Sequence, residues 1–128
     1  MRGTGRSKAG EQGVAVLLAG AAGVALVSLA GVGGLALTYA AAARSVRAAA
    51  DLVAVSGAQA QATGADACAE ARRIAARNGV ELSGCEVVGD LIDYVVQVDV
   101  RRSVGWRLPG LPERVTATAY AGNVTGVP

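Results

Sequence analysis

The stretch from Gln12 to Ala43 constrains this chain most, because none of its 32 residues carries a charge. A helix crosses a bilayer with about 20 residues, and this stretch would extend about 48 Å as one continuous helix, against a hydrocarbon core of about 30 Å. It therefore either tilts or leaves the bilayer still helical at its alanine-rich end. We predict a membrane-spanning helix over residues 12–43. The alternative, a buried helix of a globular protein, is disfavoured because such helices reach about 20 residues and the remaining chain is too short to cover one on all sides.

Residues 1–11 form a short polar leader with three basic residues and one acidic residue. Three glycines and no apolar periodicity indicate disorder, and basic residues beside a span tend to stay in the cytoplasm. We expect a single-pass protein of the cytoplasmic membrane, with its N-terminus inside and its C-terminal part outside. A removable secretory signal is the alternative, but the apolar run is about twice as long as the apolar core of a signal. This length favours a retained anchor.

Small residues recur at four-residue spacing inside the span, at Ala15, Ala19 and Gly23. Such residues on one helix face allow close approach where no hydrophobic force drives helices together in lipid. We predict helix–helix packing along this face. A segment this rich in alanine and glycine also produces the spacing by chance, so that reading stays open.

Residues 44–62 continue the helix as an alanine-rich stalk without proline. Its apolar face is thin and suits lateral packing against another helix. We expect Asp51 to pair with Arg47, one turn earlier on the same helix. The alternative partner of Asp51 is an arginine or a free amino terminus on a neighbouring subunit.

Residues 63–128 have the pattern of one small α+β module. A second helix is predicted from a cap at Thr63 to a stop at Asn78-Gly79, with Asp66 in its first turn. Beyond Gly79 the apolar period changes from helical to two, which predicts three strands: Glu86–Val88, Tyr94–Val100 and Arg114–Ala121. The predicted fold is α+β: a long N-terminal transmembrane helix with its alanine-rich extension and a second helix are packed on a small antiparallel sheet of about three strands.

The chain has two cysteines, Cys68 in the second predicted helix and Cys85 before the first predicted strand. A disulfide closing this loop would contribute about 3 kcal/mol in the chain-entropy model, which matters for a small module with an alanine core. It requires an oxidising compartment. Two buried, unpaired thiols are the alternative, because spacing alone does not fix the Cα separation.

Composition argues against several functions. The absence of histidine removes the commonest general base and metal ligand, and no nucleophile, phosphate-loop or metal-ligand motif is present. We therefore predict no enzyme, no cofactor and no metal site. A net charge of +2 and four aromatic residues give no basic face or stacking surface for nucleic acid.

The segment RAAADLVAVSGAQA (residues 47–60), following a basic leader and an apolar helix, resembles the TadE-like and TadG-like proteins of tight-adherence (Flp-type) pilus systems. The matching positions are 48–52, Ala54 and 57–58. The order of cysteine-bearing helix, Asn-Gly stop and closing strands is similar to the short actinobacterial TadE-like proteins.

The resemblance implies that the predicted fold is that of pilins and pseudopilins. It also implies that the chain is a minor pilin or pseudopilin, a structural or assembly component of a type IV-like pilus or related secretion apparatus. Its partners would be the membrane, other pilin-like subunits and the assembly machinery. A prepilin peptidase would trim the leader after Ala9 or Gly10, before Glu11. The chain departs from the pilin rule of a glutamate five residues after the cut, because Ala15 occupies that position.

Two other functions remain open. One is a single-pass, membrane-anchored binding module, with a ligand surface near Trp106 on the 101–112 connection. The other is a secreted, disulfide-stapled domain whose mature chain starts near residue 44.

Overall fold

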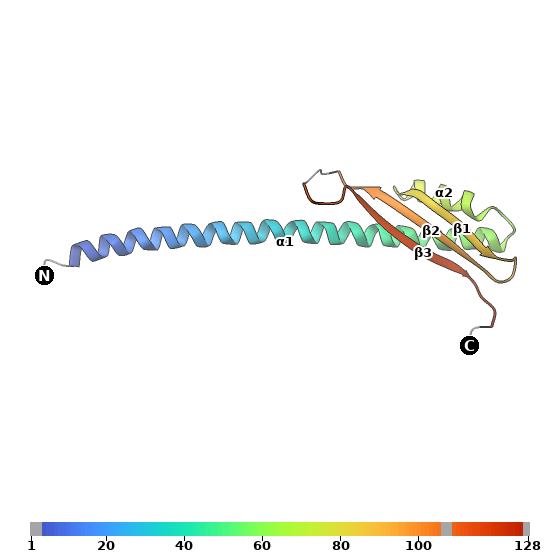
Figure 1. The fold of residues 1–128 in the computed structure, drawn as a ribbon, viewed down its shortest axis with the longest axis horizontal. Helices are drawn as coiled ribbons and strands as arrows, with labels where there is room; N and C mark the ends of the chain where they lie inside the picture. The colour runs from blue at the N-terminus through green and yellow to red at the C-terminus, as the bar shows by residue number, and fades with distance from the viewer. Residues whose placement is uncertain (1–3, 106–108, 127–128) are drawn as a thin grey trace. The chain divides into compact units, whose positions relative to one another are not determined.

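The computed structural model describes residues 4–105 and 109–126, with the side chains of the first helix described from residue 10 onward. The element order is α1 (Thr4–Ala62), α2 (Ala67–Arg77), β1 (Glu81–Gly89), β2 (Tyr94–Ser103) and β3 (Arg114–Asn123) (Figure 1). The chain divides into two compact units, Met1–Tyr39 and Ala40–Pro128. From here on, the module means this second unit, which includes residues 44–62 as well as residues 63–128. The predicted α+β class is confirmed.

The first unit holds the N-terminal part of α1, which begins at Thr4. The disorder expected for residues 1–11 is wrong from Thr4 onward. No proline interrupts this part of the sequence, and extending an existing helix by one residue costs far less than nucleating a new one. The polar leader therefore continues the helix of the apolar stretch.

The three strands form an antiparallel sheet in the order β1-β2-β3 (Figure 1). In the central strand β2, residues Tyr94, Val96, Val98 and Val100 are buried, and the residues between them are half-exposed. In β3 the buried positions Val115 and Ala119 lie on the same face. One face of the sheet is therefore covered, as the period-two pattern of the sequence predicts.

The covered face packs against the second half of α1. Contact is direct at both ends of β2: the Tyr94 hydroxyl donates to the Ala58 carbonyl at 2.9 Å, and Arg102 reaches the Ser45 hydroxyl at 2.8 Å. The buried residues of α1 recur at helical spacing, and they are Val46, Ala49, Ala50, Val53, Ala54 and Ala58. Residues 44–62 thus belong to the same compact unit as the sheet, and their packing on the sheet agrees with the predicted fold class.

Gly57 lies where α1 closely approaches both α2 and β2. A Cβ atom built there would lie 3.2 Å from the carbonyl oxygen of Ala67, 3.2 Å from Cγ1 of Val96 and 3.6 Å from Cβ of Ala71. Both α2 and β2 therefore contact α1 at this residue. The helix α1 continues through Gly57 to Ala62, because tertiary packing outweighs the low helix propensity of glycine.

The boundaries of α2 differ from the prediction at one end. Asp66, not Thr63, is the N-cap: its carboxylate accepts a hydrogen bond from the Ala69 amide at 3.0 Å. Thr63 belongs to the end of α1, where its hydroxyl donates to the carbonyl of Ala60 at 2.9 Å. The predicted stop at Asn78-Gly79 is confirmed, with Gly79 at φ +66°, a conformation that favours glycine.

The first strand is longer than predicted. β1 begins at Glu81 and pairs along its length with β2, with a register shift between Leu82 and Gly84. The sequence of its first half does not alternate cleanly, so pairing with β2 decides its conformation. The other two predicted strands are confirmed and extend two or three residues further.

We predict that Gly57→Leu lowers the free energy of unfolding by about 1–3 kcal/mol, because the new side chain must displace Val96 or the backbone of Ala67. Ala48→Leu is the control, since Ala48 is exposed on the same helix. Thermal unfolding of the full chain in detergent, followed by circular dichroism, measures both. Equal effects of the two substitutions would contradict the close packing.

Candidate functional site

The apolar part of α1 is the first candidate site. Every residue from Gly10 to Thr38 is exposed in the described chain, and Leu17, Val27 and Leu37 are each more than 70% exposed. This helix is long and apolar enough to cross a membrane. So much exposed Leu and Val in a row is costly in water and favourable in lipid.

The small residues of this segment have no role inside the described chain. Ala15, Ala19 and Gly23 lie along one face of α1 at four-residue spacing and are exposed. No described atom lies within 4 Å of the position that a Cβ atom would take at Gly23. The structure therefore places the three residues together on one face, and whether a second helix packs there stays a prediction.

The predicted cleavage positions Ala9, Gly10 and Glu11 lie within α1, and Gly10 and Glu11 are exposed. Asp51 is also exposed, on the module part of α1. Its expected ion pair with Arg47 is absent: the ion pairs between described residues join Glu70 to Arg73 and Glu81 to Arg101. An exposed pair one turn apart is worth only a few tenths of a kcal/mol, so solvation competes with it.

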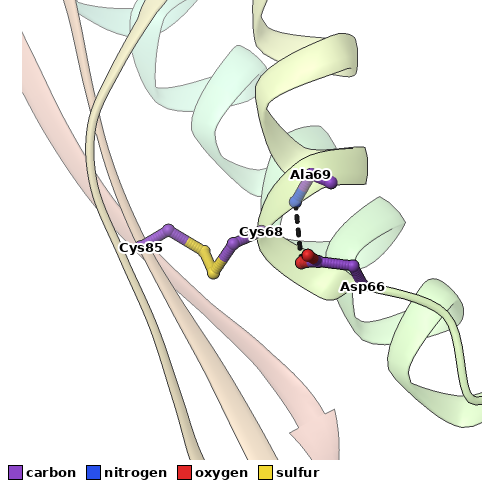
Figure 2. Close-up of a disulfide and its surroundings, with 4 residues drawn as sticks. All are labelled: Asp66, Cys68, Ala69 and Cys85. Atoms are coloured by element: carbon purple, nitrogen blue, oxygen red, sulfur yellow. Dashed lines mark hydrogen bonds between the residues drawn. A yellow bond between two sulfur atoms is a disulfide. The ribbon is translucent and has the colours of Figure 1, made fainter.

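The two cysteines meet in a disulfide between α2 and β1 (Figure 2). Their Cα atoms are 5.8 Å apart, within the range that a disulfide spans. Cys68 lies in the first turn of α2, directly after the cap made by Asp66 (Figure 2). The bridge therefore fixes the start of α2 to the middle of an edge strand.

A cleft of about 760 Å³ opens at the other end of α2 and is the second candidate site. Four arginines and one glutamate account for its charged lining: Arg72, Arg101, Arg102, Arg114 and Glu81. They come from α2, from the end of β2 and from the starts of β1 and β3. Antiparallel pairing brings these strand ends together, since Ser103 pairs with Arg114 and Glu81 with Arg101.

Arg102 joins three elements at this end of the module. Its guanidinium donates to the carbonyls of Gly79 at 3.1 Å and Asn78 at 2.8 Å, and to the Ser45 hydroxyl at 2.8 Å. The two carbonyls follow the C-terminus of α2, where a positive charge is favourable. Arg102 is thereby held in place against α1 and α2.

Arg101 is paired with the one acid of the cleft. It donates two hydrogen bonds to Glu81, at 3.0 and 2.6 Å. These hydrogen bonds hold the pKa of Glu81 below its ordinary value of 4.5 and raise the pKa of Arg101, and the charge of Arg114 lowers the pKa of Glu81 further. Arg72 and Arg114 are exposed, and their side chains make no ion pair or hydrogen bond with another described residue. The cleft therefore keeps a net positive charge.

The sequence predicted a ligand surface near Trp106 on the 101–112 connection, and it did not predict a cleft formed by these arginines. The signal was present: Arg101-Arg102 end one strand and Arg114 begins the next, so antiparallel pairing had to bring the three together. Their proximity to α2 and to Ser45 could not be predicted from the sequence, because it depends on how the helices pack against the sheet. Trp106, the predicted ligand contact, lies outside the described residues.

Comparison of the chain with models of protein families, with curated proteins and with solved structures finds no match. The TadE-like resemblance therefore rests on the residues of this sequence alone.

We predict that replacing both cysteines with serine lowers the free energy of unfolding by about 3 kcal/mol, because the open chain regains loop entropy when it unfolds. Denaturant unfolding of the full chain in detergent, with and without a reducing agent, measures this loss. Reductant should destabilise the wild type by the same amount and leave the double variant unchanged. Two free sulfhydryls on the unreduced wild type would contradict the bridge.

Proposed function

We propose that this protein is a TadE-like minor pilin or pseudopilin, a structural or assembly subunit of a Tad (Flp) type IV-like pilus or a related secretion apparatus. Its apolar helix would anchor it in the cytoplasmic membrane, and the module would lie outside. Other pilin-like subunits and the assembly machinery would be its partners.

One observation carries this proposal: a single long helix has two apolar segments, and the chain's own residues cover only the second of them. Within the module, α1 buries Val46, Val53 and Ala54 completely against its own chain. Between Gly10 and Thr38 the same helix has no covered residue. Lipid can cover that stretch in the membrane, and neighbouring helices can cover it in a polymer.

The small residues of the apolar stretch support contact between copies. Because no described atom approaches Gly13, Gly20 or Gly23, packing inside the chain does not require glycine there. Glycine in a helix is less favourable than alanine by about 1 kcal/mol, and close packing against a second membrane helix would offset that cost.

The anchored binding module is the second candidate function. The arginine-lined cleft favours it, since a net positive cleft is suited to an anionic ligand. This candidate needs no contact between apolar helices, which separates it from the first.

Cysteine cross-linking in native membranes tests the proposed contact. We expect Ala19→Cys and Gly23→Cys to form disulfide-linked pairs on mild oxidation, because both lie on the small-residue face. Leu17→Cys and Ala21→Cys are the controls, since each lies two residues from a test position and thus on the far side of the helix. Cys68 and Cys85 are already bridged and do not compete.

Equal cross-linking at test and control positions would indicate random collision and contradict a specific helix contact. No cross-linking at any position would favour the anchored monomer.

The intact mass of the membrane-extracted, unreduced protein tests leader processing. We expect the loss of the first nine or ten residues, because Ala9 and Gly10 precede the candidate cut. The remaining chain should lack two protons, since its cysteines are bridged. A full-length mass would contradict processing, and a chain that starts near residue 44 would identify a secreted domain.

A further inference from the structure

We propose that the arginine-lined end of the module binds the headgroups of anionic phospholipids. This inference rests on insertion of the apolar helix in a membrane and not on polymerisation. It therefore goes beyond the pilin-like function and can fail or hold independently of it.

The first argument is the position of this end along α1. Arg102 donates to the Ser45 hydroxyl at 2.8 Å, and Ser45 is two residues past the end of the uncharged stretch at Ala43. The cleft is therefore joined to α1 at the residues where the chain leaves its apolar part. Leu37 is 74% exposed and lies seven residues before Arg44 in the sequence, so side chains suited to lipid continue almost to the first arginine of the module. Tyr39 follows, and tyrosine is enriched where a span meets the lipid headgroups.

The second argument is the separation of charge along the module. Two further exposed arginines, Arg44 and Arg47, lie on α1 at the Ser45 end. The opposite end, where Tyr94 contacts Ala58, carries the carboxylates of the β1–β2 turn, Asp90 and Asp93. Asp90 accepts backbone hydrogen bonds there from residues 92 and 93. Two acids, Glu81 and Glu113, also lie at the Ser45 end, but the arginines there outnumber them, so this end of the module keeps a net positive charge.

The third argument is the state of the arginines themselves. Arg101 is neutralised by Glu81, and Arg102 is engaged with α1 and α2. Arg72 and Arg114 line the same cleft and remain available, with Arg102 fixed close by. Guanidinium groups bind phosphate through paired N–H donors, and a phosphate group in this cleft would meet two such side chains that have no other partner in the described chain.

An anionic lipid fits this cleft better than a soluble anion does. The cleft is open, which makes it a weak trap for a free ion, whereas a lipid is held at the interface by its own acyl chains. Each basic side chain near an anionic membrane surface contributes about a five-fold gain in binding. The lipid phosphate is therefore the ligand to which the proposal commits.

Native mass spectrometry of the full chain tests the proposal. The protein is reconstituted in vesicles of equal parts phosphatidylcholine and phosphatidylglycerol. After extraction, the mass of each complex gives the number of molecules of each lipid that remain bound. We expect phosphatidylglycerol to be retained in preference, and we expect Arg72→Gln and Arg114→Gln each to lower that preference about five-fold. Arg72→Lys and Arg114→Lys keep the charge and should retain most of it.

Arg73→Gln is the matched control. It removes the same charge from the neighbouring position of α2, but Arg73 is paired with Glu70 and does not line the cleft. Arg72 and Arg114 are exposed, so the variants should keep the wild-type circular dichroism spectrum.

Three results would overturn the proposal. Equal retention of the two lipids would show no selectivity for anionic headgroups. A preference that survives Arg72→Gln/Arg114→Gln would place the lipid elsewhere, for example at the basic leader. Protection of residues 79–82 and 101–103 from hydrogen exchange by inorganic phosphate in detergent, without any lipid preference, would identify a site for soluble anions.

Discussion

The close approach of α1 to β2 is the contact on which the module depends. The face of α1 between Val46 and Ala58 consists of alanine, valine and one glycine, and all of these residues are buried there on the sheet and α2. Short side chains bring the backbones together, so that Gly57 meets both Val96 and the carbonyl of Ala67. The cost of this geometry is a core with little apolar volume, since its largest fully buried side chains are valines. Burial of valine and alanine alone gives a modest hydrophobic stabilisation.

Polar and covalent links hold the two ends of this thin core. The Cys68–Cys85 disulfide fixes the start of α2 to β1, and Arg102 fixes the end of α2 to α1 and β2. Buried Tyr94 adds a third link through its hydroxyl to Ala58. Each link joins two different elements of the module. The module is therefore stabilised at its periphery as well as at its centre.

The two parts of α1 need different surroundings. The module part of α1 is amphipathic toward its own sheet, whereas the N-terminal part is apolar on every face and exposed. A helix that is hydrophobic all round needs an apolar environment other than its own chain. The proposed functions share this requirement: membrane anchoring satisfies it with lipid, and assembly satisfies it with other helices. Arg44 and Arg47 follow directly after the apolar stretch along α1, and Arg102 donates a hydrogen bond to Ser45 between them.

The sequence by itself determined the elements: the apolar helix, the helix stop at Asn78-Gly79, and the inward faces of β2 and β3 all follow from local periods and turn residues. It also made the cysteine pair a candidate bridge. Only the tertiary structure decided that β1 begins at Glu81, that Asp66 caps α2, and that Arg72, Arg102 and Arg114 share one cleft. The physical reason is that hydrophobic periodicity and capping act over a few residues along the chain. Helix-to-sheet packing and strand pairing instead join residues that the sequence keeps up to 57 positions apart, as in Ser45 and Arg102.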